Sequence, residues 1–304
     1  MAHVARWDFA FSGGVAAYEG HAEGFARAAI VDRGVGATHT ELALCRLGPG
    51  GRIETHVHAF ERCVYVLEGE AVLELDGRAL HLERGHFALF PVGMPHGWRN
   101  EAEAEVRWLE LSTPQPDVAG ERPDTFFVPG GPEPSAEAVR PDPSDPRSRY
   151  VGRYLGTPPQ LEALHVDAHD VRGRSPAGMD TALLAYSGIS IKMLVDTGLG
   201  ADLLTMFMVD YEPGGAAQVH DHPFEEAYFF LEGEIEADVD GVHRTLRAGD
   251  VLFCGVGELH GFFNTSGGRV RWIETQAPQP PRRHSYLWPA YWEALRERLA
   301  SDGA

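Results

Sequence analysis

HVHAFERCVYVLEGE (residues 56–70) and HDHPFEEAYFFLEGE (residues 220–234) are two versions of one stretch, 164 positions apart in the chain. The match continues without a gap to residues 100 and 264, with 17 identities in 45 aligned positions. Further along, VRWLE at 106–110 matches VRWIE at 270–274 at the same offset. A match this long at a constant offset indicates that the chain contains two copies of one structural module.

Each copy reads as a series of short strands. Runs rich in Val, Leu, Phe and Tyr alternate with turns, and Asp76-Gly77 and Asp240-Gly241 separate two such runs in corresponding places. These pairs predict two-residue hairpins, because glycine adopts positive φ easily. Many short strands with regular turns predict an all-β fold built from antiparallel sandwiches or barrels.

Composition excludes several classes of function. The chain has 304 residues and a net charge of −19. It therefore lacks the excess of positive charge that binds nucleic acids and anionic membranes. No stretch is apolar enough for a membrane span, and the N-terminus does not resemble a signal peptide. Three cysteines without a close pair argue against a disulfide framework. We therefore expect a cytoplasmic protein with neither nucleic acid nor membrane as a partner.

The repeat and the proline content predict the domain boundaries. We expect an N-terminal domain at 1–112, a proline-rich linker and connecting segment at 113–180, and a C-terminal domain at 181–304. In the last domain, Trp292, Leu295 and Leu299 have helical spacing after a proline. They predict a short amphipathic C-terminal helix over 289–299.

The second copy carries a cluster of residues typical of metal ligands. In one continuous strand, His220, His222 and Glu226 would point to the same face. His260 follows a glycine-rich turn and would join them from a later strand. Three imidazoles and a carboxylate predict a site for a divalent transition metal, with iron, manganese, nickel, copper and zinc all compatible.

An apolar cavity is expected around these ligands, since hydrophobic residues flank them. Its walls are expected to include Met206, Met208, Phe224, Tyr228 and Phe230. Within it, Glu226 and Tyr228 are the candidate catalytic residues, because they are the groups near the metal that could transfer a proton.

The first copy offers His56, His58 and His96, but Arg62 stands at the position of Glu226. An arginine beside a metal would concentrate positive charge unless an anion joined them. This possible second site is therefore either metal-free and structural, with Arg62 free to bind a carboxylate, or a three-histidine site for an anionic substrate. A β-bulge that turned Glu61 inward would be a third solution. We favour a degenerate or secondary site, with Glu61 facing outward in a structural salt bridge or in solvent.

These spacings resemble the two signatures of the cupin family, G-x5-H-x-H-x3-E-x6-G and G-x5-P-x-G-x2-H-x3-N. Residues 214–233 match the first signature fully, and residues 249–264 match the second except that Gly255 replaces the usual proline. The first copy matches at its glycines and histidines and departs at Arg62. The resemblance implies a bicupin, with two tandem jelly-roll (double-stranded β-helix) barrels.

The resemblance also suggests activities. The favoured hypothesis is a metal-dependent non-heme dioxygenase similar to flavonol-cleaving bicupins (quercetinases), acting on a small organic acid, enol or aromatic molecule at the C-terminal barrel. Its substrate would be anionic or enolisable. The alternatives are a non-redox metal enzyme, such as a decarboxylase, an isomerase or a ureidoglycine-type aminohydrolase, and a non-catalytic small-molecule binder. By analogy with relatives, we expect a homo-oligomer.

Overall fold

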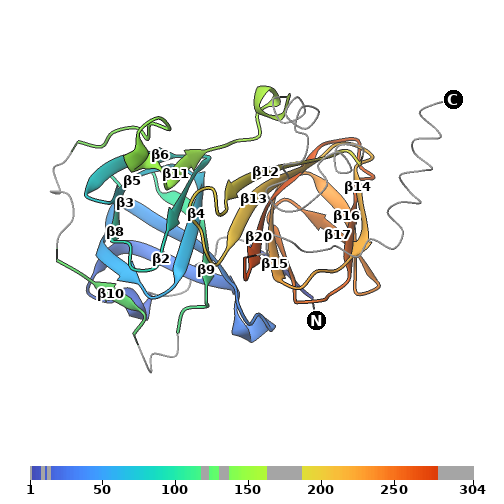
Figure 1. The fold of residues 1–304 in the computed structure, drawn as a ribbon, viewed down its shortest axis with the longest axis horizontal. Coiled ribbons are helices and arrows are strands. Elements are labelled where there is room, and N and C mark those ends of the chain that lie inside the picture. Colours follow the sequence, from blue (N-terminus) through green and yellow to red (C-terminus); the bar gives the residue numbers. More distant parts are fainter. Residues whose placement is uncertain are drawn as a thin grey trace. The chain divides into compact units, whose positions relative to one another are not determined.

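The computed structural model describes residues 2–7, 11, 15–117, 123–129, 137–162 and 187–279. The expected C-terminal helix at 289–299 lies outside these residues. Antiparallel strands dominate the described part of the chain, which confirms the all-β prediction (Figure 1). No helix among the described residues has the length and apolar character needed to cross a bilayer.

The chain forms two compact units. One, the first-repeat unit, combines Phe9–Leu155 with Leu194–Leu204. The other, the second-repeat unit, combines Met1–Asp8, Gly156–Met193 and Thr205–Ala304. Each unit therefore contains one segment that is distant in sequence from the rest of it. The boundaries expected from the sequence, at 112 and 181, remain a prediction.

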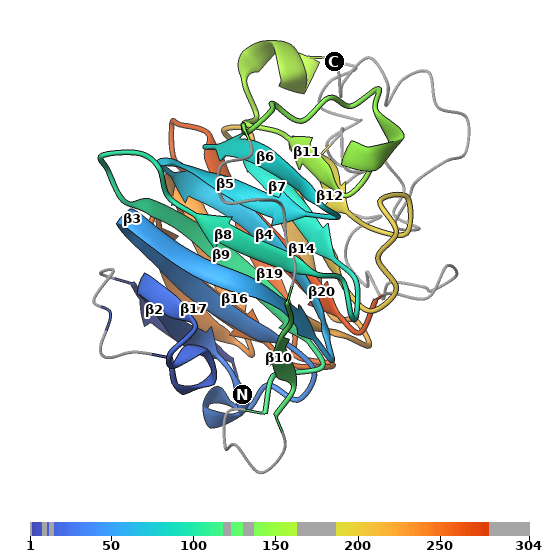
Figure 2. The ribbon, with the colours of Figure 1, turned by 90° about the vertical axis from the view of Figure 1, so that its left-hand side faces the viewer.

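The first-repeat unit is a curled sheet that encloses its own core (Figure 2). Its strands run in the order β11-β7-β4-β9-β3-β8-β5-β6, with β2 and β10 also paired to β3. The bounds are β2 Ala22–Val31, β3 Glu41–His58, β4 Glu61–Glu68, β5 Glu70–Leu75, β6 Arg78–Glu83, β7 His86–Phe90, β8 His96–Arg99, β9 Val106–Thr113, β10 Thr125–Phe127 and β11 Val151–Arg153. Three short 3-10 helices are η1 Ala16–Tyr18, η2 Arg33–Val35 and η3 Pro146–Ser148.

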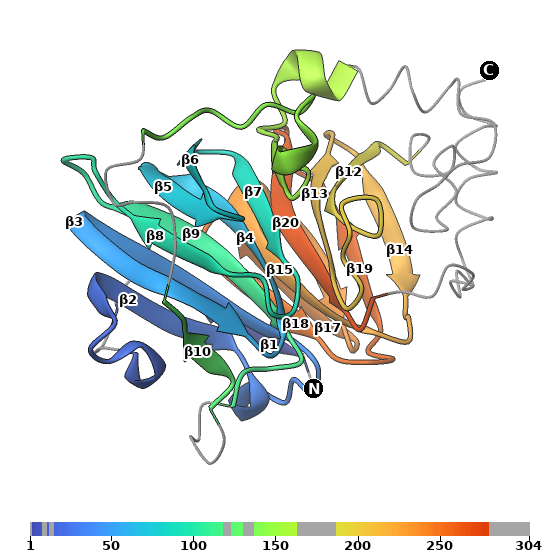
Figure 3. The same ribbon diagram turned by 60° about the vertical axis from the view of Figure 1, so that its left-hand side comes forward.

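The second-repeat unit contains two sheets (Figure 3). One has the order β1-β18-β15-β20-β13-β12, and the other has the order β14-β19-β16-β17. The bounds are β1 His3–Arg6, β12 Ile189–Val195, β13 Thr205–Tyr211, β14 Ala216–His220, β15 Glu225–Glu232, β16 Glu234–Val239, β17 Val242–Arg247, β18 Asp250–Cys254, β19 His260–Phe263 and β20 Val270–Ala277. The N-terminal strand β1 forms the edge of the first sheet by pairing with β18.

Both predicted hairpins are confirmed. Asp76 and Asp240 have φ of 49° and 51°, and the glycines that follow have φ of 70° and 75°. Each pair joins two adjacent antiparallel strands, β5 to β6 and β16 to β17. Two successive positive φ values define the turn that matches strand twist, and Asp-Gly is a sequence that tolerates them.

The expected orientation of β13 is wrong. Phe207, Val209 and Tyr211 pack into the core of the second-repeat unit. Met206 and Met208 are buried too, but they alternate with these residues and so lie on the other face of the strand. Because both faces of β13 are apolar and buried, hydrophobicity alone could not identify the inward face.

Glu61 is buried rather than exposed, and within the part of the chain that the structure describes it binds backbone groups instead of a salt-bridge partner. Its carboxylate accepts hydrogen bonds from the N–H groups of Asp202, Leu203 and Leu204 at 2.9, 3.0 and 3.1 Å. These amides belong to Leu194–Leu204, the segment of the first-repeat unit that is distant in sequence from the rest of it. This contact occupies the side chain, and it excludes the bulge that would have turned Glu61 toward the histidines.

Candidate metal centre

Three histidines of the second repeat meet inside its unit. His220 ends β14 and His260 begins β19, and the two residues are direct partners in the ladder. His222 follows β14. One potential ligand atom from each of the three lies within 4.8 Å of the others, and all three side chains are buried. The histidines that the sequence grouped are therefore together.

Glu226 joins them from a different strand. The premise of one continuous strand is wrong, because β14 ends at His220 and β15 begins at Glu225 in the other sheet. Glu226 nevertheless points to the cluster, and its Oε2 lies 2.7 Å from His222 Nε2 and 3.3 Å from His260 Nε2. The four side chains converge because the chain turns between two facing sheets.

The hydrogen bonds of the imidazoles suit a metal site. His220 Nδ1 lies 2.8 Å from the carbonyl of Gln218, and His260 Nδ1 lies 2.9 Å from the carbonyl of Glu258. A carbonyl only accepts, so each Nδ1 carries a proton and Nε2 is the nitrogen that could bind a metal. Such outer hydrogen bonds are the usual way in which proteins orient metal-binding histidines. The donor set therefore fits a divalent transition metal.

Two of the ligands are in the protonation states that a metal requires, and His260 differs from them. Burial, reinforced by His260, lowers the pKa of His220 to about 3. Burial would raise the pKa of Glu226, but His222 and His260 outweigh it and keep that pKa well below its ordinary value. A neutral imidazole and an ionised carboxylate are the forms that bind metal. Burial would lower the pKa of His260, but Cys254 and Glu226 outweigh it and raise that pKa well above its ordinary value.

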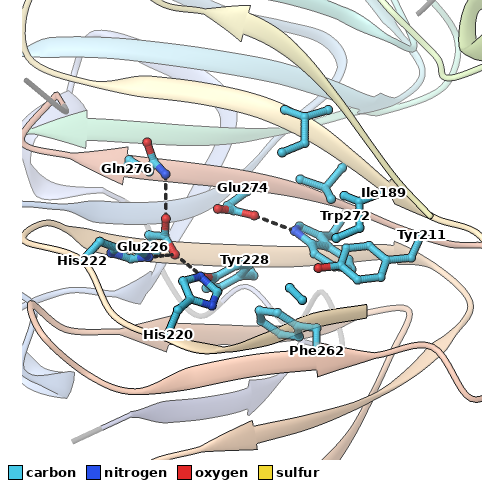
Figure 4. A pocket seen from close by; sticks show the side chains of 13 residues that line it. Ile189, Tyr211, His220, His222, Glu226, Tyr228, Phe262, Trp272, Glu274 and Gln276 are labelled. Atoms are coloured by element: carbon cyan, nitrogen blue, oxygen red, sulfur yellow. Dashed lines mark hydrogen bonds and ion pairs between the residues drawn. The ribbon is translucent and has the colours of Figure 1, made fainter. Parts of the chain in front are cut away.

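A pocket opens beside the cluster (Figure 4). Tyr228 lies in its wall, donates a hydrogen bond to Glu226 and has its hydroxyl 3.1 Å from His260 Nε2. Burial and the Glu226 charge raise the pKa of Tyr228 well above 10, so the phenol stays protonated. The pocket is lined by Ile189, Ile191, Val209, Tyr211, Ala217, His220, His222, Glu226, Tyr228, Phe262, Trp272, Glu274 and Gln276. Met206, Met208, Phe224 and Phe230, which the sequence suggested as walls, are not among these residues.

Sequence reasoning missed three residues of β20 in this pocket. Gln276 donates a hydrogen bond to Glu226 Oε1 at 2.6 Å, and Trp272 Nε1 donates one to Glu274 Oε2 at 2.9 Å. Burial and the nearby Glu226 raise the pKa of Glu274 well above its ordinary value, which favours the neutral acid. The repeated VRWLE and VRWIE segments could have identified Trp272 and Glu274. Gln276 left no such signal, because Ser112 occupies its position in the first repeat.

The first repeat brings together the equivalent histidines. His56, His58 and His96 are buried, with one potential ligand atom from each within 4.8 Å of the others. Tyr18 and Phe127 pack against the ring of His56, with centroids 5.4 and 5.5 Å away. Burial, opposed in part by a hydrogen bond to a backbone carbonyl, lowers the pKa of His56 to about 4.

Arg62 lies beside this cluster, as its alignment with Glu226 predicts, although β3 ends at His58 and β4 begins at Glu61. Its Nη1 is 3.0 Å from His58 Nε2, and its Nε donates a hydrogen bond to Ser112 Oγ at 2.9 Å. The same Nη1 is 3.3 Å from Glu110. A guanidinium is always a donor, so it engages the His58 lone pair that a metal would need. The carboxylate partner of Arg62 is therefore supplied by the protein itself.

Glu110 balances two buried arginines. Arg27 Nε donates a hydrogen bond to it at 2.8 Å, and Arg62 approaches from the other side. Burial alone would raise the pKa of Glu110, but the two guanidinium charges outweigh it and lower that pKa to about 2. Glu41 is a second carboxylate partner of Arg27. Through Arg62, this charge network contacts His58 of the first-repeat histidines.

The Glu110 network makes stability depend on acid pH. Because the folded-state pKa of about 2 lies below the ordinary 4.5, the ionised carboxylate stabilises the fold above about pH 4.5, and this stabilisation disappears as the pH falls toward 2. We expect a loss of about 3 kcal/mol in the free energy of unfolding across this window, more than half of it by pH 3. Urea unfolding of metal-free protein measures it, with Glu110→Gln as the variant that cannot titrate. Equal pH slopes for the two proteins would contradict the network.

Known proteins resemble the chain over the regions just described. A family model described as "Cupin domain" matches residues 43–112 and 207–275. The polyketide synthase protein CurC of Streptomyces cyaneus is 37% identical over 76 residues, which cover 25% of this chain and about half (49%) of that protein. Protein SchB of Streptomyces halstedii is 32% identical over 99 residues, which cover 31% of this chain and 72% of that protein.

Solved structures share the fold across both repeats. Salicylate 1,2-dioxygenase from Pseudaminobacter salicylatoxidans superposes with a TM-score of 0.67 at 14% identity, covering 91% of this chain and 84% of the enzyme. Another structure of that enzyme contains adducts with gentisate. At this identity the likeness establishes the fold alone.

Proposed function

The chain belongs to the cupin superfamily and carries two cupin domains in tandem, and from this premise we propose that it is a metal-dependent non-heme dioxygenase acting at its second-repeat pocket. One observation carries the proposal. Strands β14, β15 and β19 and the segment after β14 bring His220, Glu226, His260 and His222 to one buried point, which borders a pocket with mainly apolar walls. A metal-ligand set beside an apolar cavity is the usual form of a site for small organic substrates.

A divalent metal bound there would act as a Lewis acid toward an oxygen atom of the substrate and lower its pKa. The remaining work falls to the residues of the chain. Glu226 presents a carboxylate that can take the proton of a substrate hydroxyl. Tyr228 and Gln276 each donate a hydrogen bond to that carboxylate and so fix its direction. Phe262 and Trp272 contribute apolar surface to the pocket.

We assign a structural role to the first-repeat unit. Arg62 holds the position that Glu226 has in the second repeat, and it is engaged by His58, Ser112 and Glu110. The proposal therefore predicts one metal ion per chain, bound by the second repeat. The substrate is proposed to be a small enol or aromatic molecule. The polyketide protein CurC and the gentisate-containing dioxygenase are consistent with this class.

A non-redox metal enzyme is the second candidate. The hydrogen-bonded series Glu226–Tyr228–His260 could also move a proton in an isomerisation or a decarboxylation. Neither reaction consumes O2, so gas uptake separates the two candidates. A binding protein without catalysis would show no turnover with any metal.

The test begins with the metal content of protein purified without an affinity tag, which we expect to be one ion per chain. Protein loaded anaerobically with Fe(II), Mn(II), Ni(II), Cu(II) or Zn(II) is then given a flavonol, a diketone and a catechol in an oxygen electrode. Uptake of O2 that depends on both metal and substrate supports the dioxygenase. Product formation without O2 uptake would replace it with the non-redox enzyme. A rise in melting temperature without turnover would replace it with the binder.

A further inference from the structure

We propose that the second-repeat pocket takes a ring-bearing substrate whose one acidic hydroxyl reaches the histidine cluster, and that it rejects molecules carrying a separate carboxylate. This inference rests on the proposed function and narrows its substrate class. It departs from the expectation of an organic acid as substrate.

The pocket has one polar end and one apolar end. Figure 4 shows His220, His222 and Glu226 together at one side, with Ile189, Tyr211 and Trp272 at the other. The aromatic rings are adjacent, with the centroid of Trp272 4.8 Å from that of Tyr211 and 5.2 Å from that of Phe262. Such a surface favours a flat apolar ring, because aromatic pairs add to the gain from burial.

The pocket wall carries two carboxyl groups, the ionised Glu226 and the neutral acid Glu274. None of the described lining residues is an arginine or a lysine. A substrate carboxylate held away from the metal would lose its hydration and find no cation in exchange. An unpaired buried charge is costly, and the ionised carboxylate of Glu226 nearby increases the cost. A bound metal would be the one positive centre beside the pocket, and a single deprotonated hydroxyl would be enough to neutralise part of its charge. A separate carboxylate would then have no cation to pair with.

The two repeats differ at the positions where the first repeat holds buried cations. The first-repeat unit buries Arg27 and Arg62 beside Glu110. At the 164-residue offset, these arginines correspond to Ile191 and Glu226, and both of those residues line the second-repeat pocket. The position of Arg27 in the first repeat is therefore held by the apolar Ile191 in the second repeat. This makes Ile191 the position at which selectivity against carboxylates can be tested.

The experiment compares methyl 4-hydroxybenzoate with 4-hydroxybenzoate. Both present the same ring and the same single hydroxyl, but only the acid carries a carboxylate. Binding to protein loaded with redox-inactive Zn(II) is measured by calorimetry and by quenching of tryptophan fluorescence. We expect the ester to bind at least about tenfold more tightly, the ratio that corresponds to about 1.4 kcal/mol. Equal or tighter binding of the acid, or binding of neither compound, would overturn the inference.

Ile191→Arg supplies the missing cation, and Ile191→Met is the matched control of similar size. The arginine variant should shift the preference toward the acid by about tenfold or more, while the methionine variant keeps the wild-type preference. An unchanged preference in a folded arginine variant would count against the inference. Failure here is distinct from failure of the dioxygenase. If the ester binds more tightly but no substrate causes O2 uptake, the inference about the pocket holds and the dioxygenase proposal fails. If O2 uptake occurs but the acid binds as tightly as the ester, the dioxygenase proposal holds and the inference fails.

Discussion

Replacing His260 with alanine is expected to abolish metal retention. The side chain supplies one of three imidazoles in the cluster, and its Nδ1 is already fixed by the carbonyl of Glu258. Removing a residue that only hydrogen-bonds to a metal-binding histidine lowers metal affinity by about 10–100-fold. Removing the histidine itself should therefore lower metal affinity by at least about 100-fold. Dialysis against a chelator followed by elemental analysis measures the effect.

His243→Ala is the matched control for this experiment. His243 lies in the same unit, but its side chain is 64% exposed and pairs with Glu236 and Asp238 at the surface. The control should keep one metal ion per chain. Circular dichroism shows whether each variant keeps its strands, so that metal loss is not mistaken for unfolding. A folded His260→Ala protein with full metal content would mean that the proposed ligand set is incorrect.

Arg62→Glu is expected to give the first repeat a metal site and to raise the content from one ion per chain to two. The change removes the guanidinium that engages His58 Nε2 and restores the carboxylate found at the equivalent Glu226. Without metal, the new carboxylate lies near Glu110, and the free energy of unfolding should fall by about 3–5 kcal/mol, as when one member of a buried ion pair is removed. Added Zn(II) should recover part of this loss, because a ligand that binds only the folded state stabilises it.

Arg62→Gln provides the comparison for this variant. It removes the charge but supplies no carboxylate, so we expect destabilisation without a second metal ion. Elemental analysis and thermal unfolding with and without Zn(II) distinguish the two proteins. If Arg62→Glu stays at one metal ion per chain while remaining folded, the first-repeat histidines are not a latent metal site.

The sequence predicted the features that repeat or that depend on local chemistry. The offset of 164 grouped each set of histidines, and Asp-Gly marked both hairpins with positive φ. The errors concern contacts between distant segments. The strand break before Glu225 is not visible in an alternating pattern, and the partners of Glu61 lie more than 140 residues away.

Gln276 shows the same limit within the site. It is 50 residues from Glu226 in sequence and reaches it only because β15 and β20 are neighbours. A glutamine has no chemistry that marks it as a partner of a ligand, and the first repeat has a serine in its place. The choice between Met206 and Val209 for the pocket wall failed because both faces of β13 are buried.

Each unit contains a segment that is distant in sequence from the rest of it, and this has a consequence for biosynthesis. Strand β1 precedes the first repeat in the chain but belongs to the unit formed mostly by residues after 155. Leu194–Leu204 belongs to the unit formed mostly by residues before 156. A nascent chain therefore cannot complete its first barrel until residue 204 has left the ribosome. Until then Glu61 lacks its three amide donors. A fragment that ends at Leu155 or begins at Gly156 would lack a segment of its own unit. Each fragment would therefore need the other, co-expressed with it, to complete its barrel.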